Sequence, residues 1–174
     1  NECKSVRVPL DQFHFRKSQK RVINRNKDLA VTFEEPKFSD EYYALYQHYI
    51  NTRHADGDMH PPSEEQFTSF LCQPNPACCS YFICFRAAEK LIAVAVVDML
   101  PKGVSAIYTF FDPQYSIRSL GQLAVLWQIS WAKKQSLSFV YLGYWIKNCQ
   151  KMSYKADYQP LEVFDDLIWQ PLEP

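Results

Sequence analysis

The cysteine residues of this sequence are its first candidates for metal or redox chemistry. Six cysteines stand at positions 3, 72, 78, 79, 84 and 149, and no two of them form a C-x-x-C pair. The chain therefore lacks the ligand spacing of a zinc knuckle. Because the cysteines include the adjacent pair Cys78-Cys79 and no secretory signal is recognisable, we expect reduced thiols and a cytoplasmic protein.

A second candidate metal set is the alternating series His54, Asp56, Asp58 and His60. Ligands at every second position require an extended backbone, whereas Gly57 indicates a turn within the series. We therefore expect a polar loop here and no metal site. The sequence also has no G-x-S-x-G motif and no evident Cys–His pair, so it does not indicate a covalent nucleophile.

The distribution of charge indicates a polyanionic partner. The sequence is 47% hydrophobic and 16% aromatic, which excludes disordered, collagenous and coiled-coil chains. No apolar run reaches the roughly 18–20 residues of a membrane span. The formal net charge is zero, but residues 1–27 hold eight basic and two acidic residues, and residues 28–174 hold eleven and seventeen. A basic arm on an acidic body suits nucleic acid, and a solvated surface segment is the alternative.

Hydrophobic periodicity predicts the elements that must position any site. Helices are expected over 18–26, 40–54, 63–71 and 120–134, the third starting from a capping box of Ser63 and Gln66. Extended segments are expected over 4–15, 29–33, 81–86, 91–99, 104–111, 139–146 and 167–169. The run 91–99 is nearly all apolar and therefore central, whereas Pro9 confines the first segment to an edge or a bulge. This order predicts an α+β sandwich, with a basic arm over 1–27 and one domain over 28–174.

Three long segments resemble the aminoacyl-tRNA–protein transferases, which include arginyltransferases and the bacterial aspartate/glutamate leucyltransferases. The segments are 43–71, 91–121 and 141–160, with the motifs V-D-x-L-P, Y-x-x-F-D-P-x-Y-S and K-M-x-Y-K-x-x-Y-x-P. The stretches RHADGDM and SQKRVINRN are most similar to the bacterial branch. The resemblance implies a fold like that of the GNAT acyltransferases, with a mostly antiparallel central sheet flanked by helices.

The resemblance also implies an activity. The expected enzyme transfers an amino acid, leucine in the bacterial branch, from aminoacyl-tRNA to the α-amine of proteins that begin with Asp or Glu. Such a transfer creates an N-degron of the N-end rule. We expect a monomer without a membrane partner and without a required cofactor. Family members carry an N-terminal cysteine cluster that binds a metal or iron–sulfur centre, and Cys3 resembles its last cysteine, so the sequence given starts inside that motif.

Site residues follow from what the implied reaction must bind. The acidic acceptor needs a cation, for which Arg53, His54, Arg118 and Lys155 are candidates; we favour Arg53 and Lys155. Asp98, at the end of an apolar strand, could orient the amine, whereas Asp112 could instead cap the turn before Pro113. The tyrosines that could hydrogen-bond the ester or the ribose are Tyr144 and Tyr154, although both could equally be core residues.

The tRNA must be held by cations and by a helix start. The basic segment supplies Arg16, Lys17, Lys20, Arg21 and Arg25 for phosphate contacts. Arg118, Ser119 and Gly121 precede or open the helix over 120–134, where free backbone amides suit a phosphate or the terminal ribose.

Two other functions remain open from the sequence. One is a GNAT-type acyl-CoA N-acyltransferase, although the phosphate loop is incomplete because Arg118-Ser119-Leu120-Gly121 holds a single glycine. The other is a module that binds tRNA or N-degrons without catalysis. An arginyl donor with the same acceptors is the alternative within the family.

Overall fold

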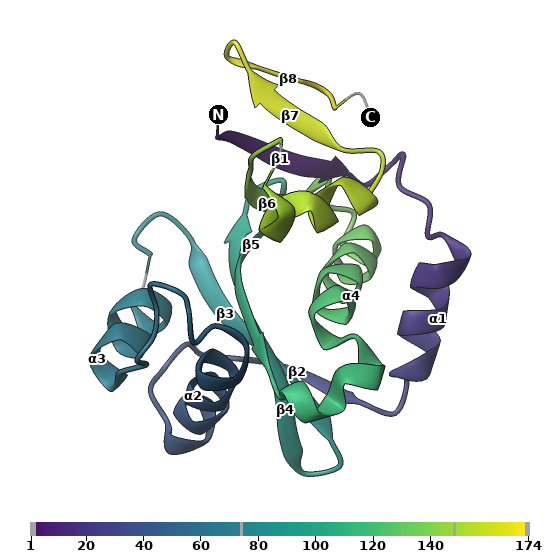
Figure 1. Ribbon diagram of the computed structural model, residues 1–174. Helices are drawn as coiled ribbons and strands as arrows, with labels where there is room; N and C mark the ends of the chain where they lie inside the picture. Colours follow the sequence, from purple (N-terminus) through teal and green to yellow (C-terminus); the bar gives the residue numbers. More distant parts are fainter. Residues whose placement is uncertain (1–2, 74, 148, 173–174) are drawn as a thin grey trace.

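The computed structural model describes residues 3–73, 75–147 and 149–172. One sheet of eight strands runs through it in the order β2-β3-β4-β5-β6-β1-β7-β8. All neighbours pair antiparallel except β5 and β6, which are parallel. Helices α2 and α3 cover one face of the sheet, and α4 and α1 cover the other (Figure 1). The α+β class with a mostly antiparallel sheet is thus confirmed.

The elements follow one another closely along the chain. The strands are β1 (Lys4–Pro9), β2 (Ala30–Glu34), β3 (Cys79–Ala87), β4 (Lys90–Leu100), β5 (Gly103–Phe111), β6 (Phe139–Trp145), β7 (Glu162–Asp165) and β8 (Ile168–Pro171). The α-helices are α1 (Lys17–Arg25), α2 (Asp40–Arg53), α3 (Glu64–Phe67) and α4 (Leu120–Lys134). A π-helical turn, η1 (Thr68–Cys72), continues α3, and the 3₁₀-helices are η2 (Pro113–Arg118) and η3 (Gln150–Asp157).

The core lies on both faces of β4, as its apolar sequence predicts. Ile92 and Val97 belong to the cluster under α4, and Val94 and Val96 belong to the cluster under α2. The helix expected over 120–134 is confirmed at both ends. The Ser63 half of the expected capping box is confirmed, since its Oγ accepts the Gln66 amide at 3.1 Å, whereas Oε1 of Gln66 accepts the Tyr46 hydroxyl at 3.0 Å.

Two expectations near the N-terminus need correction: the edge position and the Ser18 cap are wrong, whereas the bulge that was the alternative to an edge does occur in the ladder of β1 with β6. The first strand is not at an edge, because β1 lies between β6 and β7. Pro9 is tolerated there because β7 pairs only with Val6 and Arg7, so the missing N–H of Pro9 faces no partner on that side. The basic helix begins at Lys17, with Arg16 as its N-cap residue, and Ser18 is not the cap. Residues 4–25 therefore contribute an inner strand and a helix that contacts α4.

The C-terminal part holds more structure than the sequence indicates. The expected edge segment over 167–169 falls in a hairpin of β7 and β8, and β8 forms the sheet edge. The polar stretch before it includes η3, which no hydrophobic periodicity reveals. None of the helices in the described part of the chain has the length and hydropathy of a membrane span.

Candidate functional site

The most distinctive feature of the sheet is a fork between β5 and β6. These parallel neighbours pair only from Gly103 to Ser105 on β5 and from Phe139 to Tyr141 on β6. Beyond those pairs both strands continue, β5 to Phe111 and β6 to Trp145, without pairing to each other. Ligands of sheets with parallel strands commonly bind where neighbouring strands diverge at their carboxyl ends.

Two β-bulges explain why the strands part at this level. In the ladder between β4 and β5, Val96 pairs with Tyr108 and Val97 pairs with Ala106. Ile107 of β5 is therefore left without a partner residue on β4. On β6, the register with β1 passes from Gly143 to Tyr141 and leaves out Leu142. A bulge bends its strand and increases the local twist. Gly143 has φ +75°, a conformation that glycine adopts without a steric penalty.

A cleft of about 820 Å³ occupies the fork. Its walls come from the end of α2 and the loop after it, the second half of β5, the first turns of α4, β6 and η3. Of the predicted site residues, the cleft brings together Arg53, His54, Gly121, Tyr154 and Lys155. These positions are separated by up to 102 residues in the sequence and converge only through the sheet.

Lys155 is the buried cation of the cleft. It is 9% exposed, and its amine donates a hydrogen bond to the backbone carbonyl oxygen of Tyr144. Within residues 3–73, 75–147 and 149–172, no carboxylate lies within 4.0 Å of this amine. Burial lowers the pKa of Lys155, and the electrostatic interaction with Cys3 acts in the opposite direction. A buried ammonium is costly without an anion, so this arrangement favours an anionic ligand.

Arg53 and His54 line the cleft from the end of α2. The guanidinium carbon of Arg53 is 5.8 Å from the centre of the Phe111 ring, and the Arg53 side chain is otherwise exposed. Nε2 of His54 is 3.0 Å from the hydroxyl of Tyr49, and the two rings meet edge to face at 5.0 Å. Burial raises the pKa of Tyr49, so this hydroxyl stays protonated at neutral pH. Arg53 and His54 thus line the same cleft as Lys155.

The three residues predicted for chemistry are only partly brought together. Tyr154 lines the cleft and is 49% exposed. Tyr144 is 61% exposed and is not among the cleft-lining residues; its carbonyl oxygen, not its hydroxyl, contributes by holding Lys155. Asp98 also lies outside the cleft lining, where it accepts hydrogen bonds from Ser80 at 2.6 Å and Asn75 at 3.1 Å. Those bonds account for a carboxylate at the end of an apolar strand.

The carboxylate of Asp112 also has structural partners. Oδ1 of Asp112 accepts the Gln114 amide at 3.0 Å, and Oδ2 accepts the Lys90 amine at 2.9 Å. Nε2 of His48 lies 3.5 Å from Oδ1. Asp112 therefore caps η2, as its position before Pro113 predicts, and it is not among the residues that line the cleft.

The predicted tRNA-binding cations divide into exposed and engaged side chains. Lys17, Lys20 and Arg21 are exposed on α1. Arg25 donates to the carbonyl of Ile117, and the Arg118 guanidinium donates two bonds of 2.8 Å to the carboxylate of Asp28. The first group is available for phosphate contacts, whereas Arg118 already has a bidentate carboxylate partner.

The start of α1 reaches the cleft through Asp157. Nη2 of Arg16 donates to the backbone carbonyl of Asp157 at 2.6 Å and lies 3.6 Å from its carboxylate. Nε2 of Gln19 donates to the same carbonyl at 3.3 Å. Because Asp157 lines the cleft, the basic helix begins at the rim of the cleft.

The start of α4, predicted to hold a phosphate or the terminal ribose, does reach the cleft, but its backbone geometry differs from that of an ordinary helix N-terminus. Gly121 lines the cleft, and a Cβ at this position would lie 3.2 Å from the Phe111 ring. Ser119 has left-handed backbone angles, φ 53° and ψ 49°, and its side chain does not cap α4. The residue thus turns the chain sharply from η2 into α4, and its peptide geometry differs from that of an ordinary N-cap.

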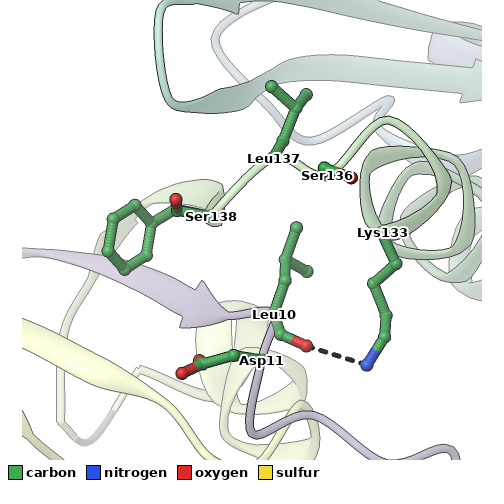
Figure 2. A pocket seen from close by; sticks show the side chains of 7 residues that line it. Leu10, Asp11, Lys133, Ser136, Leu137 and Ser138 are labelled. Carbon is green, nitrogen blue, oxygen red and sulfur yellow. Dashed lines mark hydrogen bonds between the residues drawn. The ribbon is translucent and has the colours of Figure 1, made fainter.

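A second cleft, of about 570 Å³, lies at the other end of β6 (Figure 2). The amine of Lys133 donates to the carbonyls of Leu10 at 2.8 Å and Phe13 at 2.7 Å. Its remaining lining consists mainly of Ser136, Leu137 and Ser138 on the turn between α4 and β6 (Figure 2). Lys133 therefore anchors the segment after β1, and this cleft presents no cluster of reactive groups.

The described residues do not form a metal site. All six cysteines are free, and Cys3 is exposed. No three His, Cys, Asp or Glu side chains gather closely enough to hold a metal ion in the part of the chain that the structure describes. The described residues alone thus supply no ligand set for the metal or iron–sulfur centre that the resemblance implies around Cys3.

Sequence reasoning missed the two bulges and the contribution of Asp157 to the cleft. A glycine inside a strand pattern often marks a bulge, so Gly143 in FVYLGYWI was an available signal for the bulge on β6. No comparable signal accompanies Ile107, because its bulge depends on pairing with β4.

Comparison with known proteins then decides the family. The family model described as "Arginine-tRNA-protein transferase, C terminus" matches residues 41–165. The chain belongs to this family. It is therefore an enzyme, and the aminoacyl-tRNA–protein transferase family predicted from the sequence is confirmed.

Several relatives of the transferase have names that specify the amino acid. Aspartate/glutamate leucyltransferase of Pseudomonas putida (strain W619) is 51% identical over 172 residues, which cover 99% of this chain and 72% of that protein. The enzyme of the same name from Pseudomonas fluorescens (strain SBW25) is 52% identical over 172 residues, with the same coverage. The transferase thus spans about three quarters of the length of these relatives.

Solved structures show the same fold at low sequence identity. The structure of L-PGS from Bacillus licheniformis aligns with 97% of this transferase and 57% of that chain, with a TM-score of 0.61 and 15% identity. The C-terminal domain of a putative lysylphosphatidylglycerol synthetase from Agrobacterium fabrum covers 82% of this transferase and 47% of that chain, with a TM-score of 0.58 and 13% identity. These likenesses support the fold expected of the transferase, a mostly antiparallel sheet flanked by helices.

Proposed function

We propose that this transferase moves leucine from leucyl-tRNA to the α-amine of proteins that begin with aspartate or glutamate. The names of relatives at about 50% identity support both the donor and the acceptors. Within the cell, a leucine added in this way would be an N-degron that marks the acceptor for degradation. Charged tRNA is available in the cytoplasm, which is where we place the reaction.

The observation that carries this proposal is the buried amine of Lys155. It lines the cleft, and its one described hydrogen bond goes to a backbone carbonyl, which leaves its charge without a carboxylate. The side-chain carboxylate of an N-terminal Asp or Glu would supply that missing anion. Charge-assisted hydrogen bonds of this kind contribute about 1.5–3 kcal/mol each. Arg53 and His54, which line the same cleft from the end of α2, are proposed to hold the same carboxylate.

The reaction does not require a strong general base from the protein. The α-amine attacks the carbonyl carbon of the leucyl ester, the bond from that carbon to the ribose oxygen breaks, and the ribose oxygen takes up a proton. An α-amine has a pKa near 7.7–8.0, so a useful fraction is already neutral at pH 7. Holding the amine and the ester in attack geometry then supplies a large part of the rate enhancement.

The fork offers groups that can stabilise the developing negative charge. Ile107 is left out of the ladder between β4 and β5 and lines the cleft. For this reason we assign its backbone amide as the donor to the oxyanion. One such donor stabilises the transition state by about 3–4 kcal/mol. The Tyr154 hydroxyl is assigned to the ester or the terminal ribose. Asp98 and the Tyr144 hydroxyl are given no chemical role.

The tRNA is proposed to approach along α1. The exposed cations Lys17, Lys20 and Arg21 suit phosphate groups, and the Arg16–Asp157 contacts join the start of α1 to the rim of the cleft. The unpaired acceptor end could thus enter the fork while the rest of the tRNA stays on the basic helix.

The description of the family favours arginine as a second candidate donor. The deciding experiment incubates the protein with a peptide that begins with Asp and with leucyl-tRNA, arginyl-tRNA or acetyl-CoA, each carrying the label on its transferable group. Label from leucyl-tRNA alone supports the proposal, and label from arginyl-tRNA alone selects the alternative. Transfer from acetyl-CoA alone would replace both with an acyl-CoA acyltransferase.

A further inference from the structure

The residues that line the cleft where the fork begins are apolar. Ser105 and Tyr141 form the last pair between β5 and β6, and Ala106 and Leu142 are the first residues beyond it. Val125 of α4 lines the same cleft. Leu142 and Val125 are buried in one apolar cluster, and Ala106 packs against that cluster. These three residues are named the apex pocket.

Charge is distributed unevenly along the cleft. Its charged residues are Arg53, Asp58, Lys155 and Asp157, which come from the end of α2, the following loop and η3. The cleft residues on β5, α4 and β6 carry no charge. The residues where the fork begins are therefore apolar and the charged side chains come from other elements, although the Lys155 amine reaches β6 at the Tyr144 carbonyl, two residues beyond Leu142.

We propose that the apex pocket binds the side chain of the donor amino acid and selects leucine. This inference rests on the proposed function, which brings two side chains into one cleft. The acidic side chain of the acceptor requires the charged residues of the cleft, so the apex pocket is left for the donor. The small Ala106 leaves room, and Val125 and Leu142 offer branched apolar surface to a branched apolar side chain.

The same pocket would disfavour an arginyl donor. A guanidinium placed between Ala106, Val125 and Leu142 would lose its contacts with water, and these three apolar side chains could not pair with its charge. The carboxylates that line the cleft, Asp58 and Asp157, belong to the loop after α2 and to η3. Charge and shape thus both favour leucine at the apex.

The test changes the volume of the apex and measures donor preference. One tRNA species is charged with leucine, alanine, phenylalanine or arginine, so that contacts with the nucleic acid stay constant, and transfer to a peptide beginning with Asp is measured. Val125→Ala enlarges the pocket and should raise the phenylalanine-to-leucine ratio of kcat/KM about tenfold. Ala106→Val fills it and should raise the alanine-to-leucine ratio by a similar factor.

Val140→Ala is the matched control. Val140 is fully buried in the same apolar cluster, two residues before Leu142 on β6, but it does not line the cleft. This variant should lose stability and keep the donor ratios of the wild type.

The outcomes separate the pocket from the proposed function. The apex pocket is supported when Val125→Ala shifts donor preference toward phenylalanine and Ala106→Val shifts it toward alanine. Unchanged ratios in both variants, with active transfer of leucine by the wild type, overturn it and leave the proposed function standing. A wild type that transfers none of the four amino acids overturns both.

Discussion

The amine of Lys155 donates its hydrogen bond to the backbone carbonyl of Tyr144, on the strand that forms one side of the fork. Gly143 precedes that carbonyl, and a Cβ added to it would lie 3.9 Å from the Lys155 amine. The bulge on β6 and the buried cation are thus parts of one arrangement. The bulge bends the strand away from β5 and also presents the carbonyl that holds the ammonium.

Lys155→Met should make the protein more stable while it impairs transfer. Burial lowers the pKa of Lys155, so the unfolded chain binds the proton more tightly than the folded chain does. The lysine therefore opposes folding at neutral pH, and this effect fades as the pH rises through the usual lysine range. Urea unfolding should show the variant more stable at pH 7 and the difference smaller near pH 10. A variant less stable at pH 7 would contradict the account.

Asp112→Asn should weaken the protein near neutral pH and flatten its acid sensitivity. Burial raises the pKa of Asp112, but hydrogen bonds from Lys90 and the Gln114 amide outweigh it, so the pKa is lowered overall. The stabilisation is present above the usual aspartate pKa and is lost as the pH falls through the lower folded value. The asparagine can still cap η2, so loss of the ion pair with the half-exposed Lys90 should lower the free energy of unfolding by up to about 1 kcal/mol.

The check for Asp112 is unfolding measured from pH 2 to pH 7. The wild type and Asp112→Asn should differ near neutrality and converge at the acid end. Equal stability at pH 7 would show that these contacts contribute nothing measurable.

The cations of α1 should differ from Arg118 in their effect on tRNA. Lys20→Gln or Arg21→Gln should make the slope of log Kobs against log salt less negative by about 0.7–0.9, because one phosphate contact is lost. Arg118→Gln should leave this slope unchanged, since its guanidinium is engaged by Asp28. Filter binding across a salt series measures the slopes. A larger change for Arg118→Gln than for the two α1 variants would reverse the assignment.

Gly143→Ala should destabilise the fold and lower transfer. The alanine would have to keep φ near +75°, which costs about 1–2 kcal/mol for a residue with a Cβ. The comparison is Gly57→Ala in the loop after α2, where no left-handed backbone is required; its Cβ would lie 3.3 Å from the His54 carbonyl oxygen, so this variant should lose some stability but less than Gly143→Ala. Urea unfolding of both variants checks the difference. Equal stability of Gly143→Ala and the wild type would show that β6 tolerates another geometry.

Local patterns predicted the parts of the site that lie on regular elements. Leu120, Leu123 and Trp127 recur at helical spacing, and α4 begins and ends where they indicate. Lys155, placed just after a strand end by the sequence, does line the cleft. These features depend on residues close together in the chain, so hydrophobic periodicity and the residues that start or end helices and strands are enough to predict them.

The remaining features depend on contacts between distant residues. Arg118 is matched by Asp28, and Asp98 by Ser80 and Asn75, across distances in sequence that no local pattern encodes. The inner position of β1 depends on β7, which is four residues long. The fork itself arises from register changes between paired strands, which become visible only once the sheet is assembled.

The most direct test of the central claim compares two acceptors that differ by one charge. Transfer of labelled leucine from leucyl-tRNA is measured for peptides that begin with Asp or with Asn, using the wild type, Lys155→Met and the surface control Lys102→Met. The wild type and the control should prefer Asp by about 10–100-fold in kcat/KM, and Lys155→Met should lose most of this preference. A Lys155→Met enzyme that keeps the full preference for Asp would show that the fork does not recognise the acceptor through this amine.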